Sequence, residues 1–296
     1  MELLRWDDRP RLRRPILVAA FEGWNDAGNA ASEAVDYLAR AWGSNIFAAF
    51  DSEELFDFTS ARPRVRLESG ETRRLEWPEI RLSFAPLPEA ERDVVFLAGP
   101  EPQLHWRSFA NEFRRLVISL EVEMAVLLGA LLADVPHTRP VRITGGAATP
   151  ELASLAGVEP SYYEGPTGIV GVMADILAQA GIPTASLWAS VPHYVSQSSS
   201  PKAALALVER TARILGATID VVELQLGAAS YERQINDLVA SDEDASAYVT
   251  RLEEQDEDTQ QADVDLPADE GPRLSPASGE RLAAEVERYL REHRRD

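Results

Sequence analysis

Acidic and imidazole side chains recur in the loops that follow the predicted strands of the chain. These candidates for acid–base chemistry are Glu22, Asp26, Glu101, His105, Glu164 and His193. If the loops meet at one edge of a sheet, a carboxylate and an imidazole could exchange a proton with a substrate there. A structural role explains the residues as well; Asp26, for example, is suited to cap the helix that follows it. The sequence therefore offers candidate acids and bases but no complete catalytic motif.

The pair Gly145–Gly146 is predicted to follow a strand and to precede a helix that Thr149 caps. Backbone N–H groups at such a junction can come close to a phosphate. The surrounding residues match neither the dinucleotide-binding fingerprint nor the Walker motif, which requires a lysine. An anion site and a tight turn into the helix both remain open at this point.

Ser199 and Lys202 have the Ser-x-x-Lys spacing of some acyl-transfer enzymes, but Pro201 between them also suits the first turn of a helix. The chain has no cysteine, and its four histidines include no pair at His-x-x-x-His spacing. We therefore predict no metal site and no cofactor, and we assign no catalytic residue.

The stretch from Pro15 to Gly43 must position any site. An apolar run, Pro15 to Ala20, is typical of a strand buried on both faces, and a helical pattern follows from Ala27 to Trp42. Ligands of parallel sheets gather at the carboxyl ends of the strands, so the intervening loop should line the site. The predicted cleft residues are Glu22, Trp24, Asn25, Asp26, Gly145, Gly146, Glu164, His193 and Tyr194.

Strand and helix patterns continue to alternate along the chain. We predict a hairpin at 65–75, further strands at 45–50, 79–85, 93–98, 125–132, 141–144 and 184–191, and helices at 105–120, 167–180 and 201–215. Short loops between alternating elements are typical of a parallel sheet covered by helices. The sequence therefore predicts a three-layer α/β fold with a mainly parallel sheet.

The acidic residues concentrate toward the C-terminus. We predict an α/β domain at 1–225, a helical extension at 226–252, an acidic and disordered linker at 253–280, and a short amphipathic helix at 281–296. The net charge of −20 argues against general nucleic-acid binding, which needs clustered cations.

The longest apolar run, residues 124–133, is far shorter than the ~20 residues that a membrane span needs. The N-terminal residues lack the apolar core of a secretory signal. We therefore expect a soluble, cytoplasmic protein that does not bind membranes.

Three stretches resemble the proteasome assembly chaperone 2 family: GWNDAGNAA from Gly23, the run from Tyr163 to Val195, and the run from Ser200 to Gly216. The resemblance implies a phosphorylase/hydrolase-like α/β fold. It also implies a role in assembling proteins rather than in catalysis. Together with the fold it suggests a homo-oligomer, for which we predict a trimer, with Trp77, Phe84 and Trp188 as candidate interface anchors.

Two functions remain open. In the first, the chain binds a protein partner, which could be related to the proteasome, and performs no chemistry. In the second, it is an enzyme that holds a nucleoside-like or other small anionic ligand at the strand-end cleft. The absence of a complete catalytic motif and the acidic extension, which suits a basic partner, favour the binding protein.

Overall fold

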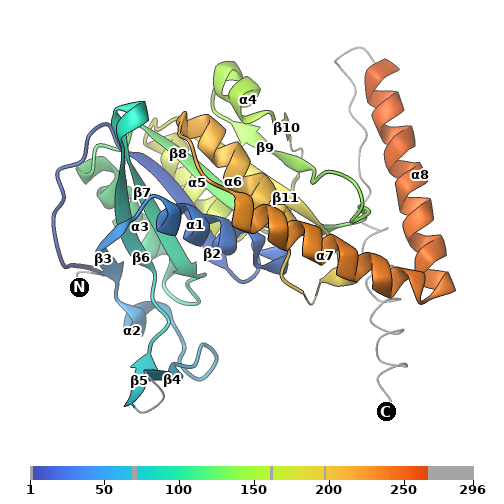
Figure 1. Cartoon of the computed structure of the whole chain (residues 1–296). Coiled ribbons are helices and arrows are strands. Elements are labelled where there is room, and N and C mark those ends of the chain that lie inside the picture. The colour runs from blue at the N-terminus through green and yellow to red at the C-terminus, as the bar shows by residue number, and fades with distance from the viewer. Residues whose placement is uncertain (1–2, 69–71, 161–162, 197, 266–296) are drawn as a thin grey trace.

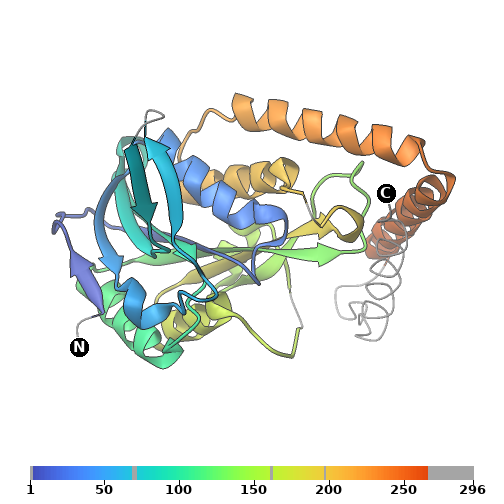
Figure 2. The ribbon, with the colours of Figure 1, turned by 90° about the horizontal axis from the view of Figure 1, so that it is seen from below.

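A nine-stranded mixed sheet separates two layers of helices (Figures 1 and 2). The computed structural model describes residues 3–68, 72–160, 163–196 and 198–265. In spatial order the strands are β1 (Leu4–Trp6), β3 (Asn45–Phe50), β6 (Arg81–Leu87), β7 (Arg92–Pro100), β2 (Ile16–Glu22), β8 (Met124–Ala133), β11 (Thr184–Pro192), β9 (Ile143–Ala147) and β10 (Glu159–Pro160). The central strands β7, β2, β8 and β11 are parallel, and the antiparallel strands β6 and β9 flank them. The predicted α/β class with a mostly parallel sheet is confirmed.

Strand β2 lies at the centre of the sheet because its side chains are apolar on both faces. Alternate residues of a strand point to opposite sides. Ile16, Val18 and Ala20 therefore enter one core, whereas Leu17, Ala19 and Phe21 enter the other. All six are almost completely buried, as the apolar run predicts.

Within the described part of the chain, helices cover both faces of the sheet. The first core is closed by α1 (Ala30–Ala41), α4 (Pro150–Ala156) and α6 (Pro201–Leu215), and the second by α2 (Ser52–Leu55), α3 (Trp106–Ser119) and α5 (Ile169–Gln179). Short 3₁₀ turns η1 (Ala27–Asn29), η2 (Pro88–Ala90) and η3 (His193–Val195) occur in the connections. Thr149 caps α4 by accepting a hydrogen bond from the Leu152 N–H, as predicted. No helix among the described residues is long and apolar enough to cross a membrane.

Gly145 and Gly146 lie inside strand β9, not in a turn before α4. They pair with Leu187 and Ser186 of β11 in an antiparallel ladder. Because β9 runs against the central strands, both glycines lie at the edge of the sheet where β11 begins. The prediction that they join the other loops at the strand-end cleft is therefore wrong. Glycine is required at 145 for packing, since a Cβ atom there would lie 1.8 Å from the Ser186 carbonyl oxygen.

The hairpin of β4 (Arg64–Glu68) and β5 (Thr72–Glu76) forms a separate two-stranded sheet beside α2 (Figure 1). One of its faces carries the exposed apolar side chains of Val65, Leu67 and Leu75. Trp77, which follows the hairpin, is also exposed and packs against Phe58. Phe84 and Trp188, the other two predicted interface anchors, are partly buried against the second core.

Two long helices occupy the segment predicted as a helical extension and continue into the first part of the predicted acidic linker. Helix α7 (Val222–Ala240) packs on α6, and α8 (Glu243–Asp265) leaves the end of α7 in a steeply different direction (Figure 1). The prediction of disorder is thus wrong for 253–265, while 266–280 and the predicted amphipathic helix at 281–296 lie outside the described residues. Two acidic side chains of α8 form ion pairs with arginines that lie far away in the sequence: Asp256 pairs with Arg142 at 2.7 Å, and Glu257 pairs with Arg139.

We expect Gly145→Ala to lower the free energy of unfolding by about 3 kcal/mol, because the new methyl group would force β9 away from β11. Gly146→Ala is the matched control, since a Cβ atom at position 146 meets open space. Its effect should stay within about 0.5 kcal/mol. Urea unfolding of the two variants measures both changes; equal losses would contradict the placement of Gly145 in the ladder.

Candidate functional site

The four central parallel strands end at one edge of the sheet, and the loops that follow them meet there. The loop after β2 is tied to β7, β8 and α6 by backbone hydrogen bonds. In each bond a backbone N–H donates to a backbone carbonyl: Glu101 to Glu22 (3.0 Å), Ala130 to Asn25 (2.8 Å) and Ser200 to Gly28 (2.8 Å). The expected convergence of the loops around 22–26, 99–105 and 192–200 is therefore present.

A carboxylate of the chain itself occupies the N-terminus of α5. One oxygen of Glu101 accepts from the Ile169 N–H at 2.7 Å and from Nδ2 of Asn25 at 3.0 Å. The first N–H groups of a helix attract negative charge because they carry no partner within the helix. The position where α5 could bind an external anion is thus already filled by Glu101.

Asn25 is the buried centre of this arrangement. Only 1% of the residue is exposed, and its backbone carbonyl is held by β8. A Cβ atom on Gly168 would lie 2.2 Å from Nδ2 of Asn25, so position 168 must be glycine for the amide to fit. Among the described residues the other amide atom, Oδ1 of Asn25, has no hydrogen-bond partner. Asn25 therefore links β8, the loop after β7 and α5.

Asp26 satisfies the N-terminus of α1, as the sequence predicts. Its carboxylate accepts from the N–H groups of Ala31 (2.7 Å) and Ser32 (3.2 Å) and from the Ser32 hydroxyl (2.5 Å). Burial raises the pKa of Asp26, these three hydrogen bonds oppose the rise, and the Asp36 carboxylate adds to it. The carboxylate is therefore occupied in holding the helix.

An open depression of about 560 Å³ lies between this loop and the end of β8. Trp24 is 63% exposed and lines it together with the exposed side chains of Leu131 and Leu132. The remaining lining residues are Gly23, Asp26, Ala27, Gly28, Asn29, Ala130, Ser196 and Ser198. Trp24 thus forms part of the wall of an open, mainly apolar surface and does not plug an enclosed pocket.

Further carboxylates stand close to this depression. Burial raises the pKa of Glu33 on α1; the Asp26 and Asp36 carboxylates raise it further, and Arg40 lowers it. Glu22, at the end of β2, is exposed. The depression therefore lies in a locally acidic region of an acidic chain.

Two of the predicted acid–base candidates form no hydrogen bond with Asn25 or Asp26 within the described residues. Glu164 is exposed in the segment that leads to α5. His105 is mostly exposed, precedes α3, and its Nδ1 atom lies 3.5 Å from Oε2 of Glu54. The structure thus does not gather the predicted acids and histidines around one reacting position.

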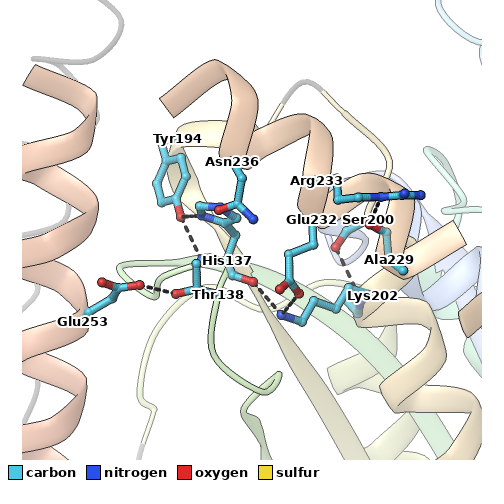
Figure 3. A network of polar contacts seen from close by, with 11 residues as sticks. His137, Thr138, Tyr194, Ser200, Lys202, Ala229, Glu232, Arg233, Asn236 and Glu253 are labelled. Atoms are coloured by element: carbon cyan, nitrogen blue, oxygen red, sulfur yellow. Dashed lines mark hydrogen bonds and ion pairs between the residues drawn. The ribbon is translucent and has the colours of Figure 1, made fainter. Parts of the chain in front are cut away.

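Tyr194 belongs to a different polar network, centred on the buried His137 (Figure 3). The Tyr194 hydroxyl lies 2.6 Å from Nδ1 of His137 and accepts from the His137 N–H at 2.8 Å. On the other side of the ring, Nε2 lies 3.1 Å from Oδ1 of Asn236 on α7. These distances fit a neutral imidazole that accepts at Nδ1 and donates at Nε2. His193, next to Tyr194, has a buried Nδ1 with no hydrogen-bond partner among the described residues.

Lys202 joins this network and not Ser199. Its ammonium group donates to the carbonyl oxygen of His137 at 2.5 Å and to Oε2 of Glu232 on α7 at 2.7 Å. Ser199 instead lies 3.2 Å from the Asn29 amide nitrogen. The lysine is therefore engaged as a cation and is not placed to activate the serine. Sequence reasoning missed the role of His137 and Asn236, because only the fold brings them together.

The two sites perform structural tasks with the polar groups that sequence analysis proposed for chemistry. Asp26 and Glu101 hold helix N-termini, and Lys202 and His137 hold α7 to the sheet domain, with Tyr194 bonded to the other side of the His137 ring. Within the described residues, no three histidine, aspartate or glutamate side chains are grouped to hold a metal ion. The accessible remainder of the strand-end site is the apolar depression beside Trp24.

Comparisons with known proteins agree on one family. The PAC2 family model matches residues 20–239. A PAC2 family protein from Streptomyces avermitilis is 45% identical, with a TM-score of 0.72, over 79% of this chain and 99% of that one. A proteasome-assembly chaperone homologue from Mycobacterium tuberculosis is 43% identical, with a TM-score of 0.71 over the same shares of the two chains. PbaB, an archaeal proteasome activator from Pyrococcus furiosus, shares the fold at 18% identity and a TM-score of 0.64, over 80% of this chain and 99% of its own. No functionally curated protein matches the chain.

The His137 network should make stability depend on pH. Burial lowers the pKa of His137 from 6.5, the neighbouring Lys202 ammonium lowers it further, and the Asn236 hydrogen bond, Glu232 and Glu253 oppose this. The unfolded chain therefore binds a proton at His137 more readily than the folded chain does. The stability that the neutral ring provides is present above pH 6.5 and is lost as the pH falls through the lowered folded-state pKa.

We expect His137→Gln to cost about 1–2 kcal/mol at pH 7.5, because Tyr194 and Asn236 lose a buried partner. The variant should also flatten the loss of stability between pH 7 and pH 5. His105→Gln, which changes a mostly exposed ring, is the control. Urea unfolding across this pH range provides the comparison; identical pH slopes for the wild type and His137→Gln would contradict the assignment.

Proposed function

Because the chain belongs to the PAC2 family, we propose that it is a non-catalytic protein-binding factor that assists the assembly of a proteasome-related complex. The observation that carries this proposal is how the strand-end polar groups are used. Asn25, Asp26 and Glu101 direct their hydrogen bonds inward to β8, α1 and α5. What they leave open to solvent is an apolar depression, which suits a protein side chain better than a reacting substrate.

The proposal extends to the partner. The Mycobacterium tuberculosis relative is described as a proteasome-assembly chaperone homologue, so proteasome subunits are the first partners to test. The net charge of −20 also favours a partner with a basic surface, because opposite charges speed the encounter of two proteins.

We also propose that the chain forms a homo-trimer. The exposed apolar face of the β4–β5 hairpin supports self-association, since an isolated two-stranded sheet gains stability by packing against another surface. Light scattering at micromolar concentration should return three times the chain mass of 32.6 kDa. A monomer mass would contradict this assignment, and a dimer mass would correct the number of subunits.

Reconstitution tests the assembly role. We expect the purified protein to form a complex with separately purified α- or β-type subunits of an actinobacterial proteasome, detectable by native mass spectrometry. It should also speed the appearance of peptidase activity when the subunits are mixed.

Glu164→Ala and His193→Ala serve as the control variants, because both residues were candidates for catalysis. If the role is binding, both should retain the complex. Failure of the wild-type protein to bind either subunit type would contradict the assembly role. A hydrolase or phosphorolysis activity of the protein alone, lost in these variants, would show an enzyme instead.

A further inference from the structure

Strand β8 extends beyond its neighbour β2. The ladder between them covers Ile16–Ala19 and Met124–Leu127, and a single bridge then joins Asp26 to Ala130. On its other side β8 stays paired with β11 as far as Ala133. From Leu131 to Ala133, no strand in the described part of the chain pairs with the side of β8 that faces the Trp24 depression.

The direction of one backbone bond shows which groups face this open edge. The Ala130 N–H donates to the carbonyl of Asn25, away from β11. In a parallel strand the N–H and C=O groups of one residue point to the same neighbour, and the pattern repeats every second residue. The N–H and C=O groups of Leu132 therefore point away from β11 and toward the depression.

The side chains around this edge are apolar, which is unusual for a sheet edge that contacts only water. Natural sheet edges are protected by charged residues, prolines or a covering segment. Here Leu131 is 39% exposed and Leu132 is 41% exposed, and Trp24 is more exposed than either. An open backbone edge together with exposed apolar side chains is what a peptide that adds a strand to a sheet recognises.

The charges near the edge determine which charge the bound peptide should carry. Asp26 lines the depression, and Glu33 and Asp36 on α1 are close enough to interact with it electrostatically. Arg40 on the same helix and Arg81 on β6 both interact with Asp36. They offset this charge only in part, because two cations face the three carboxylates of Asp26, Glu33 and Asp36. A cationic segment is therefore attracted, and an acidic one is repelled.

We propose that the open edge of β8 at Leu132 binds an extended segment of the partner protein in which apolar side chains alternate with arginine or lysine. The segment pairs with the Leu132 N–H and C=O groups and places an apolar side chain in the depression beside Trp24. This inference rests on the proposed function, because it names the surface by which the partner is recognised.

The probe is an acetylated and amidated octapeptide of alternating leucine and arginine, tested with the full-length protein by calorimetry. Two further peptides are controls: one has glutamate in place of arginine, and one carries N-methyl groups on alternate amides, which removes pairing with an edge. We expect only the first to bind well, and its affinity should fall with added salt because the charge contribution is screened.

Two variants of one position separate backbone pairing from general attraction to an acidic protein. Leu132→Pro removes the N–H at the open edge and leaves the pairing with β11, since that N–H points away from β11. Leu132→Val keeps the N–H and most of the apolar surface. We expect Leu132→Pro to weaken peptide binding about tenfold or more, and Leu132→Val about threefold or less. Circular dichroism and melting curves show whether both variants fold. If Leu132→Pro does not fold, binding of the N-methylated peptide to the wild type decides whether backbone pairing is needed.

Equal affinity of the peptide for wild type and a folded Leu132→Pro, or equal binding of the N-methylated peptide, would overturn the inference. So would no binding of the first peptide to the wild type. A change of oligomer mass in Leu132→Pro would identify the edge as a contact between copies and would also overturn it. These outcomes are distinct from failure of the proposed function, which is the absence of any complex between the wild type and proteasome subunits.

Discussion

The free N–H groups at the N-termini of α1 and α5 must be satisfied at the point where four parallel strands end. Asp26 does this for α1, and Glu101 does it for α5 with support from Asn25. Because each carboxylate belongs to a loop that follows a central strand, the same bonds fix the helices to the sheet. The arrangement of the loops, the closed α5 N-terminus and the open depression all follow from this requirement.

This use of polar groups differs from that in enzymes which bind an anionic ligand at the strand ends of a similar sheet. In α/β enzymes the helix N-termini at the strand ends are free to hold an anionic ligand. Here the chain supplies its own anion at α5, and the Lys202 ammonium is paired with Glu232 outside the strand-end site. The surface that remains accessible is apolar, with Trp24 at its rim. This accessible surface supports the proposed recognition of a protein partner.

Local pattern was enough to predict the elements whose residues carry a strong signal. The apolar run of β2, the capping role of Asp26 and the start of α4 at Pro150 all follow from neighbouring residues. The direction of β9 did not follow, because five residues ending in Gly-Gly-Ala do not encode which neighbour they pair with. The part of α8 at 253–265 was mistaken for a disordered linker because its stabilising partners, Arg139 and Arg142, lie more than a hundred residues earlier. The His137 network is likewise built from side chains of separate elements, so no spacing in the sequence predicts it.

The contact between Asn25 and Gly168 has a consequence for the divergence of this sequence. Any side chain at 168 would place a Cβ atom within 2.2 Å of the Asn25 amide, which is buried and cannot move aside into solvent. A mutation away from glycine at 168 is therefore tolerated only after position 25 has become smaller. A smaller residue at position 25 in turn removes the amide that orients Glu101. The two positions are thus expected to covary across relatives, and the order in which they change is constrained.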